Sequence, residues 1–128
     1  MTVKNYRDLV VWQKSMQLVK LVYQLVKMLP REETFALSNQ MRRAAVSIPS
    51  NIAEGYDRNS RKEYVHFLNI ARGSNSELRT QLQICVDIGY LTEEDVRDAM
   101  ETAEEISRMI SVIIKKLTPD PCALTPDP

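Results

Sequence analysis

The sequence predicts an all-α fold, an antiparallel four-helix bundle with up-down-up-down topology. Apolar residues recur at spacings of three and four along almost the whole chain, which is the period of a helix that buries one side. The alternation of apolar and polar residues that is typical of strands is absent, and only three of the 128 residues are glycine. Short breaks separate four long periodic segments, and short connections favour antiparallel packing of consecutive helices.

The first helix is predicted over residues 8–29. Two apolar stripes, which begin at Val11 and Trp12, together cover about half of its circumference. Pro30 ends the helix because proline cannot continue the ladder of backbone hydrogen bonds. The second helix is predicted over residues 34–55.

Polar residues mark the starts of the last two helices. Ser60 and Glu63 have the spacing of a capping box at the start of a third helix over residues 60–89. Thr92 is a suitable N-cap for a fourth helix over residues 92–117, and three acidic residues follow it at the positive end of the helix dipole. The bundle is therefore expected to occupy residues 1–117. A Pro-rich tail follows at residues 118–128, and we expect it to be extended and mobile, or docked on a surface.

Composition and charge limit the classes of protein to which this chain can belong. Lys and Arg together balance Asp and Glu, at 17 each, so the formal net charge is zero. Residues 1–30 nevertheless hold five basic residues against one acidic residue, whereas residues 92–117 hold four against seven. No segment has the roughly 20 apolar residues of a membrane span, and the N-terminus has no secretory apolar run. We therefore expect a cytosolic protein that contacts no membrane.

Candidate catalytic and metal-binding residues are scarce. His66 is the sole histidine, and the two cysteines, Cys85 and Cys122, lack the spacing of a metal knuckle or a redox pair. A di-iron bundle needs Glu-x-x-His on two helices, and the chain has none. The sequence also lacks a phosphate-binding glycine loop and a nucleophile elbow. We predict a protein that is not an enzyme, with no catalytic residues, no metal site and no cofactor.

The second helix carries a narrow polar face on an otherwise apolar surface. Its residues have spacings of three and four: Gln40, Arg43, Ser47, Asn51 and Glu54. A buried anion needs a partner, and Lys14, Arg58 and Arg61 are candidates for Glu54. Three interpretations stay open: a structural polar network that fixes helix register, part of a binding site, or an ordinary exposed face.

The apolar surface exceeds what one bundle buries. Pro49 interrupts the second helix, either to bend it around the core or to expose backbone to a ligand. A helix that is apolar nearly all round is normally buried on more than one side. We therefore expect contact with another copy of the chain through a surface on the first two helices: Leu21, Val46, Pro49 and Ala53.

Four segments carry a resemblance to a known family. They are DLVVWQKSMQLVKLVY, LSNQMRRAAVSIPSNIAEGY, SRKEYVHFLNIARGSNSELRTQL and IGYL, and they begin at Asp8, Leu37, Ser60 and Ile88. The chain resembles the four-helix-bundle family named after open reading frames in intervening sequences of bacterial large-subunit ribosomal RNA genes. The resemblance implies a ring-like homopentamer. It also implies a fold similar to the accessory proteins of diversity-generating retroelements, which bind nucleic acid and a reverse transcriptase.

Two functions follow as hypotheses. The first is a self-assembling scaffold or interaction module that contacts itself and a protein partner. The alternative is an accessory protein that binds RNA or DNA phosphates through basic patches repeated around a ring, with strong salt dependence. The candidate residues for this alternative are Lys14, Lys20, Arg42, Arg43, Arg58, Arg61 and Arg72.

Overall fold

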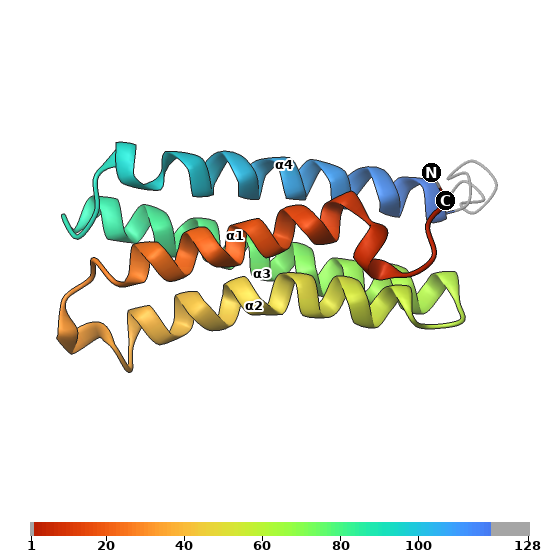
Figure 1. Cartoon of the computed structure of the whole chain (residues 1–128), viewed down its shortest axis with the longest axis horizontal. Coiled ribbons are helices and arrows are strands. Elements are labelled where there is room, and N and C mark those ends of the chain that lie inside the picture. Colours follow the sequence, from red (N-terminus) through yellow and green to blue (C-terminus); the bar gives the residue numbers. More distant parts are fainter. Residues whose placement is uncertain (1, 119–128) are drawn as a thin grey trace, which may run out of the picture.

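Four long α-helices form the bundle in the computed structural model, which describes residues 2–118. The elements follow in the order η1 (Tyr6–Asp8), α1 (Val10–Val26), η2 (Arg31–Glu33), α2 (Leu37–Tyr56), α3 (Arg61–Asp87) and α4 (Glu93–Leu117). Each helix packs on its two neighbours in cyclic order, so that α1 lies between α2 and α4 (Figure 1). This arrangement confirms the predicted all-α four-helix bundle. The predicted tail lies outside the described residues, apart from Thr118.

The first helix is shorter than predicted at both ends. Asn5 caps η1, because its side chain accepts a hydrogen bond from the backbone N–H of Arg7 at 2.8 Å. Leu9 is extended and separates η1 from α1. At the other end, α1 stops at Val26, four residues before Pro30. The apolar periodicity continues through these turns, which is why it does not reveal the breaks.

Ser60 and Thr92 cap the last two helices as predicted, but the complete capping box lies at α4 and not at α3. The Ser60 side chain accepts from the Glu63 N–H at 3.0 Å, but Glu63 directs its carboxylate to Arg58 rather than back to the cap. The complete capping box occurs instead at α4, where Thr92 and Asp95 bond reciprocally at 2.9 and 3.0 Å.

Gly89 ends α3 in the manner expected of a C-terminal cap. Its φ of 85° lies in the left-handed region, where glycine carries no steric penalty. Tyr90 N–H donates to the Cys85 carbonyl and Gly89 N–H donates to the Val86 carbonyl, which together form a Schellman motif. The chain can therefore reverse within a few residues and start α4 antiparallel to α3.

The core is formed by apolar residues from all four helices, at the spacings of three and four that the sequence shows. The largest fully buried side chains include Leu18, Met41, Ile48, Ile52, Leu68, Leu78, Leu82, Ile106 and Ile110. Pro49 is also buried within the subunit, so it offers no surface to another copy and corrects that part of the prediction. Met16 and Tyr23, which continue the apolar stripe that begins at Trp12, are substantially exposed.

Candidate interaction surface

The polar face of α2 divides into an interhelical network and an exposed part. Ser47 Oγ shares a hydrogen bond of 2.8 Å with Ser74 Oγ on α3. Asn51 Nδ2 donates to the Ser47 carbonyl at 2.8 Å and to Ser47 Oγ at 2.9 Å. Ser47 and Asn51 therefore belong to a network that ties α2 to α3. Gln40 and Arg43 are exposed and make no hydrogen bond to this network within residues 2–118, so for these two residues the structure favours the interpretation of an ordinary exposed face over that of a structural polar network.

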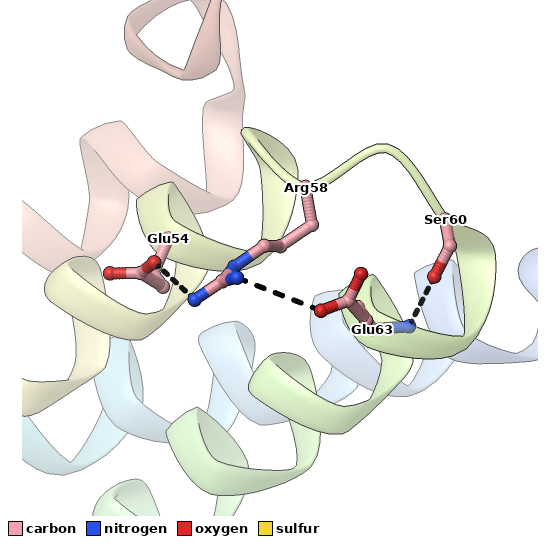
Figure 2. Close-up of polar contacts among 4 residues, drawn as sticks. All are labelled: Glu54, Arg58, Ser60 and Glu63. Atoms are coloured by element: carbon pink, nitrogen blue, oxygen red, sulfur yellow. Dashed lines mark hydrogen bonds and ion pairs between the residues drawn. The ribbon is translucent and has the colours of Figure 1, made fainter.

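Glu54 lies at the surface rather than in the core. Its carboxylate pairs with Arg58 at 2.9 Å, and Arg58 also reaches Glu63 at 3.6 Å across the α2–α3 loop (Figure 2). The Arg58 guanidinium lies over the Phe67 ring, 5.0 Å from its centroid. Exposed pairs of this kind contribute at most about 1 kcal/mol each. Of the three predicted partners, Arg58 pairs with Glu54, while Lys14 pairs with Glu105 of α4 at 3.2 Å.

Two grooves flank the outer side of α2. The groove toward α3 has a volume of about 610 Å³ and is mostly polar, with Gln40, Arg43 and Glu77 among its lining residues. Phe35 also lines this groove, and 93% of its surface is exposed. The helical spacing of apolar residues does not predict the exposure of Phe35, because this residue lies between η2 and α2.

The groove toward α1 is smaller and combines apolar with basic side chains. Its volume is about 400 Å³, and its lining includes Tyr23, Arg42, Arg43 and Val46. Tyr23 and Val46 are 42% and 41% exposed. We call the surface formed by Met16, Tyr23, Arg42, Arg43, Val46 and Ala53 the α1/α2 face.

The seven basic residues predicted to bind nucleic acid do not form one patch. Lys20, Arg42 and Arg43 lie on α1 and α2, and no carboxylate lies within ion-pair distance of them in the described part of the chain. Arg58 is held between two carboxylates, and Lys14 is paired. Arg72 donates to Asn69 and Ser111 at the junction of α3 and α4. Arg61 is exposed at the start of α3.

Three titratable groups have pKa values raised by their surroundings, and all three are neutral in the folded protein near neutral pH. Burial raises the pKa of the Cys85 thiol, with a smaller effect of the Glu33 charge, so the thiol stays protonated. Burial also raises the pKa of Tyr64, with Tyr56 adding to it. Tyr90 donates to Glu33 at 2.7 Å, and this bond raises the pKa of the Tyr90 phenol.

The described residues hold no cluster of three or more His, Cys, Asp or Glu side chains placed to bind a metal ion. From residue 2 to residue 118, every helix is too short or too polar to cross a membrane.

The chain matches one family model and a solved structure. The sequence model of the 23S rRNA-intervening sequence protein family matches residues 7–112. A solved structure from Bacteroides thetaiotaomicron, described as a protein of unknown function from the S23 ribosomal protein family, is 31% identical. The match covers 83% of this chain and 99% of that one, with a TM-score of 0.77. No curated protein matches the chain. The chain belongs to the 23S rRNA-intervening sequence protein family.

Proposed function

We propose that the protein is a non-enzymatic interaction module that assembles with further copies of itself through the α1/α2 face. The observation that carries this proposal is the shared groove of Tyr23, Val46 and Arg43, in which exposed apolar side chains lie beside a guanidinium that has no ion-pair partner among residues 2–118. Tyrosine and arginine are enriched at the energetic centres of protein interfaces.

The expected interface residues are not all on this face. Val46 and Ala53 lie on the flank of α2 that adjoins α1. Leu21 is seven residues after Lys14, so it lies on the flank of α1 that adjoins α4, where Lys14 meets Glu105. Apolar surface thus flanks α1 on both sides, and a ring, such as the pentamer implied by the family resemblance, would use both.

Light scattering coupled to size exclusion tests the proposal on the full chain. The wild type should elute at a multiple of the 14.7 kDa subunit mass. Val46→Arg should reduce the mass to one subunit, because it places a charge inside the apolar contact. Ile70→Arg is the matched control, since Ile70 is similarly exposed but lies on α3. A wild type that elutes as a single subunit would refute self-assembly.

Nucleic-acid binding is a second candidate, supported by the charge of α1. Residues Val10–Val26 include two lysines and no acidic residue, and Lys20 has no carboxylate partner in the described structure. Single-stranded RNA should then bind at low salt and dissociate as salt rises. Lys20→Gln combined with Lys27→Gln should weaken this binding and leave the assembled mass unchanged. Absence of RNA binding at low salt would eliminate this candidate.

A further inference from the structure

Phe35 is the most exposed of the large apolar side chains in residues 2–118. Its surface is 93% exposed, whereas Ile88, the next in order, is 55% exposed. An aromatic ring in water gains nothing from burial, so the stability of the subunit does not account for Phe35. The ring also lines the groove of about 610 Å³ between α2 and α3. Phe35 therefore has the placement of a residue that contacts a ligand in this groove.

Hydrogen bonds hold the backbone on both sides of Phe35. The Glu33 carboxylate accepts from the Tyr90 hydroxyl at 2.7 Å and from the first backbone N–H of α2 at 3.2 Å. Arg42 donates to the Thr34 carbonyl at 3.2 Å. These bonds tie the loop to α2 and to the α3–α4 connection. An aromatic side chain on a backbone that is already held loses less conformational entropy when it binds.

The lining of the groove beside Phe35 is largely polar. Four of its residues carry amide or hydroxyl groups: Asn39, Gln40, Ser47 and Ser74. The centre of a protein–protein contact is usually apolar and desolvated, and these side chains would lose water there. A ligand that fits both the groove and Phe35 therefore combines an aromatic face with a polar edge.

Two charged side chains complete the groove. Arg43 from α2 and Glu77 from α3 are exposed, and neither has an ion-pair partner in the described part of the chain. A guanidinium binds phosphate oxygens, and a carboxylate accepts a hydrogen bond from the exocyclic amino group of cytosine. The groove thus offers an aromatic ring for the face of a base, amides and a carboxylate for its edge, and a guanidinium for phosphate.

We propose that the groove between α2 and α3 binds single-stranded nucleic acid, with one base stacked on Phe35 and a phosphate of the same strand at Arg43. Arg43 lies about 9 Å along α2 from its start at Leu37, at 1.5 Å per residue. This is close to the length of three nucleotides at about 3.4 Å each, so one strand reaches both groups. The inference rests on the nucleic-acid candidate above, but places the contact on α2 and α3 rather than on the lysines of α1.

Fluorescence anisotropy with the full chain tests the stacking contact. The probe is a labelled oligocytidylate of about ten nucleotides at low salt. Phe35→Ala and Phe35→Leu should each weaken binding about tenfold, because stacking on the ring is lost. Phe35→Leu is the matched control for apolar contact, since leucine has no aromatic face. Phe35→Trp should keep the affinity of the wild type, and its added indole fluorescence should fall when the strand binds.

Salt dependence tests the phosphate contact. The slope of log K against log salt is about −0.7 for each phosphate that a protein contacts on a single strand. Phe35→Leu should keep the slope of the wild type, whereas Arg43→Gln should make it shallower by about 0.7. Arg61→Gln, at an exposed arginine at the start of α3, is the matched control and should change neither slope nor affinity. Arg43 also lines the α1/α2 face, so light scattering should accompany each titration. An unchanged slope for Arg43→Gln would remove the phosphate contact from the proposal.

The outcomes separate this site from the candidate site on α1. Equal affinity of the wild type and Phe35→Leu refutes stacking in the groove. If binding then falls only with Lys20→Gln combined with Lys27→Gln, the lysines of α1 are the site. Absence of binding at low salt refutes both sites and leaves self-assembly untouched.

The edge of the base and the need for a single strand are tested separately. Oligocytidylate should bind more tightly than oligouridylate, because uracil has no exocyclic amino group for Glu77, and equal affinities would remove Glu77 from the site. A duplex of the same length should leave the fluorescence of Phe35→Trp unchanged, because its bases are already stacked. Quenching by the duplex would overturn the proposal.

Discussion

Gly55 lies where α2 packs closely on α3, and of the three glycines it leaves least room for an added side chain. A Cβ atom placed there would lie 2.7 Å from Phe67 Cβ, 3.1 Å from Tyr64 Cδ1 and 3.2 Å from the Tyr64 carbonyl oxygen. Phe67 Cβ is attached directly to the backbone, so rotation of the side chain cannot relieve the clash. We predict that Gly55→Ala forces the two helices apart and destabilises the protein.

The magnitude follows from two opposing terms. Overpacking of a tight contact costs about 1–3 kcal/mol. Alanine in place of glycine inside a helix returns up to about 1 kcal/mol. The net expectation for Gly55→Ala is therefore a loss of up to about 2.5 kcal/mol in the free energy of unfolding.

Gly73 provides the matched control. It lies inside α3 and is exposed, and a Cβ atom added there would meet no other atom within 4 Å. Gly73→Ala should therefore raise the free energy of unfolding by about 0.5–1 kcal/mol. Urea unfolding followed by circular dichroism measures both variants, and the slope with denaturant should stay constant. If Gly55→Ala is as stabilising as Gly73→Ala, the close approach of α2 and α3 is wrong.

Three further predictions concern the loops and the core. Tyr90→Phe removes the hydrogen bond to Glu33, which raises the pKa of the Tyr90 phenol in the folded protein. The bond therefore stabilises the protein below about pH 10, and this contribution is lost as the pH rises through the raised pKa. The melting temperatures of wild type and variant should converge at alkaline pH, and a difference that stays constant with pH would contradict this. Thr92→Ala should cost about 0.5–2 kcal/mol in urea unfolding because it removes a capping box, and a loss of less than about 0.3 kcal/mol would argue against the cap. The buried Asn75 side chain donates to the Ala103 carbonyl, and a carboxylate in its place would lose this bond and be desolvated. Asn75→Asp should therefore destabilise the protein by about 3 kcal/mol or more at neutral pH, and by less in acid, where the carboxyl group is protonated. Equal stability of variant and wild type at pH 7 would show that the site is hydrated.

The fold is predictable because its determinants are local. The period of the apolar stripes on residues such as Leu18, Ile48 and Ile106 reports which side of each helix is buried. Ser60, Gly89 and Thr92 have backbone roles that depend on a few neighbouring residues. The start of α1 at Val10 is not predictable in this way, because η1 and its cap at Asn5 leave the apolar periodicity unbroken.

The candidate surface is predictable only in part, because it depends on contacts between helices. The spacing of the polar residues on α2 does not distinguish Ser47, which bonds to Ser74, from Gln40, which is exposed. The apolar neighbours of Glu54 suggest burial, yet Arg58 one turn later holds its carboxylate at the surface. The prediction of Pro49 on a contact surface is wrong because this residue points into the subunit.

The formal net charge of the chain is zero, but its charged side chains are unevenly distributed over the surface of the bundle. The basic residues Arg42 and Arg43 and the acidic residues Glu94 and Asp98 lie on opposite sides of α1 and lack ion-pair partners within the described subunit. Arg42 donates to the Thr34 carbonyl at 3.2 Å, and the other three side chains are exposed within one subunit. If the α1/α2 face is the contact proposed above, Arg42 and Arg43 bring positive charge to it, and any ion pairs that they form there lie near the surface and are screened by salt. Assembly should then weaken as salt rises.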